Sequence, residues 1–281
     1  APGVESFFKF NILSFLELHI IFENNSKMIE IETSHYVKGV HNLLNAHFDL
    51  RNHSKFEKDL KKFEEFSKSN LVQQHNNFKV QVFVYLTNAK INMHFTRGSF
   101  QEGLKLVPEI ENQIEEYSLL LDKHRILLFN YKIAVLNFGN GDYARSIDYL
   151  QRIINDQVDL RNDLQCYARL VHLLAHYELG NYSLMESLTK SVYRFMAKME
   201  NLTVIEEEMF KFLRASFKLS RHKVKQELEL FLQKIKHLEK NRFETRSFAY
   251  LDIISWLESK VYDKPMSEII SRKYIESKHR N

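Results

Sequence analysis

Residues 134–154, AVLNFGNGDYARSIDYLQRII, and residues 173–193, LLAHYELGNYSLMESLTKSVY, follow one pattern. In each, a segment with apolar residues at helical spacing stops at a glycine, Gly141 or Gly180. A second amphipathic segment begins shortly after that glycine. The pattern predicts a helix–turn–helix unit that occurs twice in succession.

The residues that follow each glycine predict the geometry of the turn. Glycine closes a helix readily because it adopts the left-handed backbone conformation at low cost. Asp142 and Asn181 come next, and their side chains can accept hydrogen bonds from the free N–H groups that open the second helix. Tyr143 and Tyr182 follow, and we expect both rings to point inward between the two helices of their hairpin.

Weaker copies of this turn pattern occur in the sequence before and after the two hairpins. Ser54 and Ser99 are each followed by Glu three residues later, as in a capping box, and Ser220 is the faintest copy. The five predicted N-cap positions, 54, 99, 142, 181 and 220, are separated by 45, 43, 39 and 39 residues. A nearly constant period in this range is typical of stacked helical hairpins, since one hairpin cannot bury its apolar face alone.

The turn resembles that of the tetratricopeptide repeat, in which Gly-x-Tyr follows the first helix of each hairpin. Gly141-Asp142-Tyr143 and Gly180-Asn181-Tyr182 match this motif, whereas Ser146 and Met185 stand where the family usually has alanine. The segment LRNDLQCYARLVHLLAHYELGN at 160–181 also resembles a group of uncharacterised bacterial helical-repeat proteins. The resemblance implies an all-α fold, an α-solenoid of stacked antiparallel hairpins coiled into a right-handed superhelix, and it implies no activity.

Three parts of the chain are predicted from this reading. Residues 1–26 form an apolar N-terminal helix packed on the first hairpin, residues 27–240 form about five TPR-like hairpins, and residues 241–281 form C-terminal capping helices with the only tryptophan, Trp256. The apolar N-terminal segment contains charged residues and has no uncharged stretch near the roughly 18 residues that a membrane span requires. We therefore expect no membrane association.

Composition agrees with a helical protein in a reducing compartment. The chain of 281 residues contains 7 Gly and 3 Pro, too few for the many turns of an all-β fold. Its one cysteine, Cys166, excludes an internal disulfide, and its apolar helical setting indicates a buried, reduced thiol. The expected compartment is the cytoplasm.

Sequence motifs for catalysis are absent. The chain has no glycine-rich phosphate loop, no Gly-x-Ser-x-Gly elbow, no cysteine pair and no His-Glu-x-x-His motif. His172 and His176 lie one helical turn apart, a spacing that can place two imidazoles on one metal, but no third ligand can be assigned. We therefore predict a protein that is not an enzyme and has no metal, cofactor or catalytic residues.

A polar stripe on the first helix of the second hairpin predicts a binding surface. Its members recur at spacings of 4, 4, 3 and 4 residues, so they share one narrow face, while apolar residues cover the rest of the helix. Polar residues on the preceding and following inner helices would continue the stripe into a concave groove. The predicted ligand groove comprises Gln81, Asn88, Asn92, Arg161, Gln165, Arg169, His172, His176, Lys211 and Arg214.

Charge suggests what such a groove would bind. Residues 211–246 contain eleven Lys or Arg against four Glu, a net charge of +7 that exceeds the +4 of the whole chain. Amides in the groove would pair with an extended peptide backbone, and Arg or Lys with its carboxylates. Arginine interleaved with aromatic residues, as used to stack bases, is not evident in this region, so we do not expect nucleic acid as the partner.

Two functions therefore follow from the sequence. The first is a non-enzymatic protein–protein interaction scaffold that holds a peptide or partner segment in a polar and partly basic concave groove, with acidic segments among the candidate partners. The alternative is a ligand-sensing or peptide-sensing regulatory module of a longer protein, with its effector domain upstream of residue 1. The sequence does not identify the partner or the oligomeric state.

Overall fold

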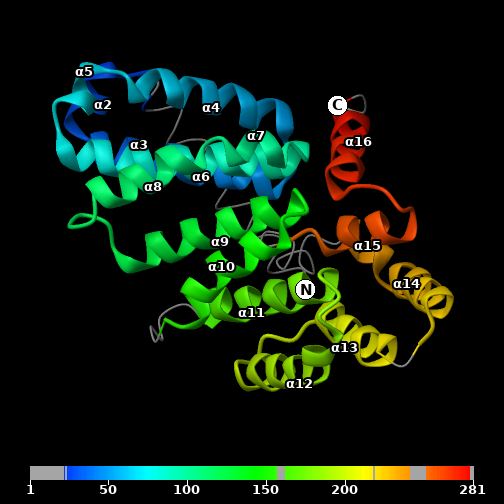
Figure 1. Ribbon diagram of the computed structural model, residues 1–281. Helices are drawn as coiled ribbons and strands as arrows, with labels where there is room; N and C mark the ends of the chain where they lie inside the picture. The colour runs from blue at the N-terminus through cyan, green and yellow to red at the C-terminus, as the bar shows by residue number, and fades with distance from the viewer. Residues whose placement is uncertain (1–21, 23, 157–161, 218, 241–250, 279–281) are drawn as a thin grey trace. The chain divides into compact units, whose positions relative to one another are not determined.

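The computed structural model describes residues 22, 24–156, 162–217, 219–240 and 251–278. Every regular element in these ranges is a helix, and none of the described residues forms a strand, which confirms the all-α prediction. Helices pack mainly on their neighbours along the chain (Figure 1). The fold divides into two compact units, each considered by itself: unit 1 is Ala1–Thr96, Glu109–Leu121 and Arg280–Asn281, and unit 2 is Arg97–Pro108 and Asp122–His279.

Unit 1 is built around the packing of two long helices. It contains the whole of α2 (Ser26–Ile31), α3 (Thr33–Asp49), α4 (His53–Ser67) and α5 (Asn70–Gln73). Helix α6 (Asn76–Arg97) belongs to unit 1 up to Thr96, and α8 (Val107–Glu116) belongs to it from Glu109 onward. Val37, Val40 and Leu44 of α3 meet Phe56, Leu60 and Phe63 of α4 in one buried cluster. These residues recur at intervals of three and four, so each helix buries one apolar stripe.

Two expectations for unit 1 need correction. Residues 27–50, which the apolar spacing predicts as one helix, are interrupted at Glu32, which ends α2 and opens α3. Ser54 is not an N-cap, because α4 begins at His53 with Asn52 at the N-cap position. The predicted N-terminal helix, residues 1–26, lies almost wholly outside the described residues, although Phe22 packs edge-on against Tyr36 with ring centroids 5.8 Å apart.

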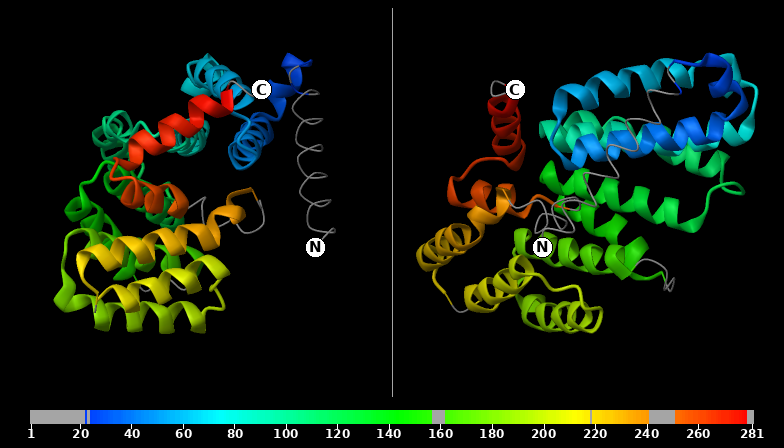
Figure 2. Two further views of the ribbon diagram at one scale, coloured as in Figure 1. Left: turned by 90° about the vertical axis from the view of Figure 1, so that its right-hand side faces the viewer. Right: turned by 180° about the vertical axis from the view of Figure 1, so that it is seen from behind.

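Unit 2 carries the hairpins predicted from the repeated turn. Its helices are α7 (Phe100–Leu104), α9 (Lys123–Gly139), α10 (Tyr143–Ile154), α11 (Asn162–Glu178), α12 (Tyr182–Lys198), α13 (Val204–Ser216), α14 (Arg221–Ile235), the 3-10 helix η1 (Lys236–Lys240), α15 (Ile253–Val261) and α16 (Met266–Lys278). Helices α9, α10 and α11 lie side by side in Figure 1. Helices α13, α14 and α15 follow as successive layers in the left view of Figure 2.

The turn chemistry is confirmed in most details. Gly141 and Gly180 both have positive φ, 84° and 71°. The Asp142 carboxylate accepts a hydrogen bond from the Arg145 N–H at 3.1 Å, as an N-cap should. Asn181 also stands at an N-cap position, but its side chain makes no cap bond there. Further along, Thr203 and Glu206 form a capping box at the start of α13, as the Thr-x-x-Glu spacing of residues 203–206 predicts.

The two turn tyrosines differ, contrary to expectation. Tyr143 is partly buried and packs edge-on against Phe138 with ring centroids 5.1 Å apart. Tyr182 is 65% exposed, so the prediction that it points inward is wrong. The shared Gly-x-Tyr sequence therefore specifies the turn and leaves the position of the ring to its surroundings.

Close approaches in unit 2 depend on two other glycines. A Cβ at Gly139 would lie 2.5 Å from the Phe100 ring, so only glycine lets α7 pack this closely on α9. A Cβ at Gly98 would lie 2.5 Å from the Ser267 carbonyl oxygen, so a residue with a side chain at position 98 would prevent the close packing of α16. Within unit 2, the C-terminal helix α16 thus packs against Gly98, which lies shortly before α7.

Within the described part of the chain, no helix has both the length and the apolar character needed to cross a bilayer.

Candidate functional site

The predicted polar stripe of α11 lies against α10 and α12. Gln165 is only 7% exposed, and its Nε2 donates to the Ile153 carbonyl at 2.8 Å and to the Asp156 carbonyl at 3.3 Å. The Ile153 carbonyl lies in the last turn of α10, where it also accepts from the Asp156 N–H at 3.1 Å, and Asp156 follows the end of the helix. The amide of Gln165 is therefore used within the protein to complete the C-terminus of α10.

Arg169 lies on the same stripe and bridges the same two helices. Its guanidinium lies 4.0 Å from the ring centroid of Phe195 on α12, and its Nη2 donates to the Ile154 carbonyl of α10 at 3.4 Å. Burial lowers the pKa of this guanidinium. A cation stacked on an aromatic face and bonded to a helix C-terminus is held in one place.

The two histidines of the stripe form an edge-on pair, and the described residues offer no third ligand beside them. The rings of His172 and His176 meet edge-on with centroids 4.5 Å apart, and Asn181 lies 2.9 Å from His176 Nδ1. Burial, with contributions from His176 and Arg169, lowers the pKa of His172 to about 4, so this ring is neutral at physiological pH. Among the described residues, no three His, Cys, Asp or Glu side chains are placed to hold a metal ion.

The other predicted groove residues are divided between the units. Asn88 and Asn92 of α6 are buried in unit 1, and Asn88 Nδ2 donates to the Val84 carbonyl of its own helix at 2.8 Å. Gln81 is half-buried and donates to the Ser34 carbonyl at 3.5 Å. Arg161 lies outside the described residues. The predicted residues of α6 therefore belong to unit 1, and those of α11 lie together in unit 2.

The two predicted residues of α13 are exposed, as a binding surface requires. The Arg214 guanidinium lies 4.5 Å from the ring centroid of Tyr193, which in turn meets Phe210 edge-on at 5.3 Å. Lys211 forms an ion pair with Glu208 at 2.6 Å, and Lys234 reaches the other oxygen of that carboxylate at 3.0 Å. Arg214 is thus positioned by an aromatic ring, whereas Lys211 is engaged with a carboxylate.

Three cationic residues of α12 were not predicted from the sequence. They form a charged row between Arg169 and Arg214. Lys190, Arg194 and Lys198 are exposed and recur every four residues, so they share one side of the helix. Lys190 pairs with Glu186 at 2.7 Å. The signal is visible in the sequence as a Lys-x3-Arg-x3-Lys spacing. We call the set Arg169, Lys190, Arg194, Lys198 and Arg214 the cationic face.

A second site, also not predicted, is centred on a carboxylate at the end of α11. Glu178 has a side chain only 8% exposed. It accepts hydrogen bonds from Trp256 Nε1 at 2.6 Å and from Lys260 Nζ at 2.5 Å. The Tyr143 hydroxyl also donates to it, and burial together with this carboxylate raises the pKa of that phenol. Helices α10, α11 and α15 therefore meet at one buried carboxylate.

An aromatic wall surrounds this carboxylate. Trp256 is 1% exposed and meets Tyr177 edge-on with ring centroids 6.3 Å apart. Tyr177 meets Phe212 of α13 in the same way at 5.9 Å. We call Tyr143, Tyr177, Glu178 and Phe212 the α15 docking site.

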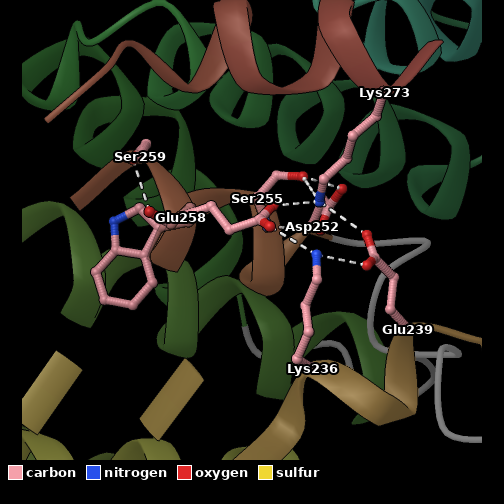
Figure 3. Close-up of polar contacts among 8 residues, drawn as sticks. Lys236, Glu239, Asp252, Ser255, Glu258, Ser259 and Lys273 are labelled. Carbon is pink, nitrogen blue, oxygen red and sulfur yellow. Dashed lines mark hydrogen bonds and ion pairs between the residues drawn. The ribbon is translucent and has the colours of Figure 1, made fainter. Parts of the chain in front are cut away.

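Four alternating charges from η1, α15 and α16 form a closed ring (Figure 3). Lys236 Nζ lies 2.7 Å from Glu239 and 2.6 Å from Glu258, and Lys273 Nζ lies 2.8 Å and 2.5 Å from the same two carboxylates. Lys273 also donates to Ser255 Oγ at 2.9 Å. Two cations balance two anions, so this ring joins η1, α15 and α16 without a net charge to attract a ligand.

No protein-family model matches the chain, and no curated protein and no solved structure matches it either.

Proposed function

We propose that the chain is a non-enzymatic interaction scaffold whose cationic face binds an acidic segment of another protein. The observation that carries the proposal is the pair of stacked arginines on the two sides of α12. Arg169 lies over Phe195 and Arg214 lies over Tyr193, and both rings belong to the same stretch of α12. Guanidinium groups held on aromatic rings lose less side-chain entropy when a carboxylate binds them.

The row on α12 supports an extended acidic partner. Lys190, Arg194 and Lys198 repeat along the helix at about 6 Å per step, from the rise of an α-helix. An extended peptide advances about 6.6 Å over two residues. Carboxylates on alternate residues of a partner strand would therefore match successive cations of the row.

The proposal also includes a TPR-like solenoid and a cytoplasmic location. A TPR-like solenoid would present its hairpins in series, and the chain-neighbour packing of α9 to α14 is consistent with that arrangement. A buried single cysteine, Cys166, is consistent with a cytoplasmic protein. In this proposal the groove predicted from the sequence is replaced by the exposed surface of α12 and α13.

The test is a peptide array probed with the purified chain, in which the number of Asp and Glu residues per peptide is varied. We expect binding to rise with acidic content and to fall at least tenfold in an Arg194→Glu/Arg214→Glu variant. The matched control is Lys223→Glu/Lys225→Glu, which makes the same charge change at exposed positions of α14. Equal binding by the two variants would show that the cationic face is not the binding surface for acidic peptides.

A parallel titration separates the protein partner from a nucleic acid. Single-stranded RNA and duplex DNA are added to the same protein over a salt series, since phosphate contacts give a steep salt dependence. Tighter binding to nucleic acid than to every acidic peptide would overturn the proposal.

A further inference from the structure

The exposed side of α12 carries a serine with a free hydroxyl among its cations. Ser191 is exposed, and its hydroxyl has no hydrogen-bond partner among the described residues. Arg194 and Lys198 follow three and seven residues later, so all three residues lie on one side of the helix. A hydroxyl beside two cations offers neutral and charged donors to the same bound anion.

The guanidinium of Arg194 is already placed beside this serine. Its Nε donates to the Lys190 carbonyl at 3.3 Å, so the side chain folds back along the helix toward the turn that contains Ser191. Its two terminal nitrogens have no acceptor within the described part of the chain. Side chains of a helix lean toward its N-terminus, so Lys198 extends toward the turn of Arg194. We call Ser191, Arg194 and Lys198 the Ser191 patch.

The charge of the Ser191 patch matches a dianion. Neither Arg194 nor Lys198 forms an ion pair with any described residue, whereas Lys190 is paired with Glu186 at 2.7 Å. A phosphomonoester carries about 1.5 to 2 negative charges at neutral pH on three terminal oxygens. A carboxylate has a single charge on two oxygens. One phosphoryl group can therefore engage the hydroxyl and both cations of the patch, and one carboxylate leaves a cation unbalanced.

We propose that the Ser191 patch binds a phosphoserine or phosphothreonine, so that the acidic segment bound by the cationic face is a phosphorylated segment of another protein. The inference rests on the proposed function, since it names the anion bound at one part of that face. The guanidinium of Arg194 takes two phosphoryl oxygens as a fork, the Ser191 hydroxyl donates to the third, and Lys198 adds its charge. Arg214, stacked on Tyr193, remains available to carboxylates near the phosphorylated residue.

Ser187 provides a matched control on the same helix. It is exposed one turn before Ser191 on the same side of α12, but its hydroxyl donates to the Leu184 carbonyl at 3.0 Å. The cation that follows it three residues later, Lys190, is paired with Glu186. The two serines are therefore alike in exposure, and only Ser191 places a free donor beside unpaired cations.

The experiment uses one acidic peptide in three forms, with serine, glutamate or phosphoserine at its central position. Binding to the full chain is measured by fluorescence anisotropy. We expect the phosphoserine form to bind at least tenfold more tightly than the glutamate form, because the fork and the hydroxyl engage more oxygens.

Three variants, checked for wild-type helicity by circular dichroism, locate the phosphoryl group. Ser191→Ala should reduce the preference for phosphoserine over glutamate by about threefold or more, whereas Ser187→Ala should leave it unchanged. Arg194→Lys keeps the charge and removes the fork, so it should reduce the preference as well.

The outcomes distinguish this inference from the proposed function. Equal affinity for the phosphoserine and glutamate forms, with both lost in Arg194→Glu/Arg214→Glu, would overturn the phosphoryl site and leave the acidic-peptide scaffold standing. A preference that neither Ser191→Ala nor Arg194→Lys changes would overturn the site too. Binding of none of the three forms would overturn both proposals.

A nucleic acid competitor tests the class of partner. Each phosphodiester of single-stranded RNA carries one negative charge, so RNA should bind the patch more weakly than the phosphoserine peptide at the same salt concentration. Tighter binding of RNA, lost in Ser191→Ala and Arg194→Lys, would overturn the assignment to a phosphorylated protein.

Discussion

The hairpins α9–α10 and α11–α12 start from nearly the same turn sequence and end with different environments for the turn tyrosine. Gly141-Asp142-Tyr143 and Gly180-Asn181-Tyr182 share the left-handed glycine and the N-cap position. Tyr143 reaches Glu178 on the next hairpin and becomes partly buried. The residue that corresponds to Glu178 in the next repeat, 39 residues later, is Phe217, so Tyr182 has no matching carboxylate on the next hairpin. Tyr182 is 65% exposed.

The difference shows that the turn and the burial of its tyrosine are specified by different residues. The motif is local, because a positive φ and an N-cap can be specified by three consecutive residues. Burial of the tyrosine depends on Glu178, and Glu178 in turn depends on Trp256 and Lys260 about 80 residues further on. The following substitutions test this separation, beginning with the largest expected effect.

Replacing Glu178 should have the largest effect on stability. Glu178→Ala leaves the Lys260 ammonium, the Trp256 indole N–H and the Tyr143 hydroxyl without their shared acceptor, and we expect a loss of about 3 to 4 kcal/mol in the free energy of unfolding. Chemical denaturation followed by circular dichroism measures this loss. The control is Glu186→Ala on α12, which removes an exposed pair with Lys190 and should cost less than about 0.5 kcal/mol. Similar losses for the two variants would contradict the role of Glu178.

The matched tyrosines should differ by about 1 kcal/mol. Tyr143→Phe removes a hydroxyl that donates to a buried carboxylate, so we expect a loss of about 1 to 2 kcal/mol. Tyr182→Phe removes the same atom from an exposed ring and should change stability by less than about 0.5 kcal/mol. Denaturant midpoints of the two variants give the comparison directly. Equal losses would show that the bond between the Tyr143 hydroxyl and Glu178 adds nothing to stability.

What the sequence could predict follows the same division between local and distant information. Helix ends at Asp122, Asp142 and Thr203 were predictable because each cap is a short-range arrangement. The position of Ser54 was wrong because Asn52, two residues earlier, offered a competing start for the same helix.

The candidate sites were harder to predict because they depend on contacts between helices. The spacing of the α11 stripe predicts that its residues share one face, but spacing does not tell whether that face meets solvent or the neighbouring helices α10 and α12. Glu178 could have been noticed as an acid in the last turn of a helix, which breaks the local electrostatic preference. Its partners on α15 could not, since nothing local relates residue 178 to residue 256.

The two N-cap residues should also differ, by a smaller amount. Asp142→Ala removes a side-chain acceptor from the Arg145 N–H and should destabilise the chain by about 1 kcal/mol. The Asn181 side chain makes no cap bond and contacts His176 instead, so Asn181→Ala should cost about half as much. Thermal unfolding of the two variants tests the order. A larger loss for Asn181→Ala would show that its contact with the histidine outweighs a helix cap.

The α11–α12 hairpin should be the more sensitive of the two to mild acid, because it alone contains the paired histidines. Burial lowers the pKa of His172 to about 4, below the ordinary value of about 6.5 in an unfolded chain. The unfolded state therefore binds a proton between these two values while the folded state does not. The contribution of the neutral ring is complete above about pH 6.5 and falls as the pH decreases toward 4.

Allowing for the partial exposure of His172, we expect a loss of about 1 kcal/mol between pH 7 and pH 5. The variant His172→Gln cannot bind a proton, so it should lose less stability over the same interval. Denaturation curves of both proteins at the two pH values measure the difference, and His222→Gln is the control because that histidine is exposed on α14. Parallel losses in wild type and His172→Gln would show that the acid sensitivity arises elsewhere, and the two hairpins would then respond to pH alike.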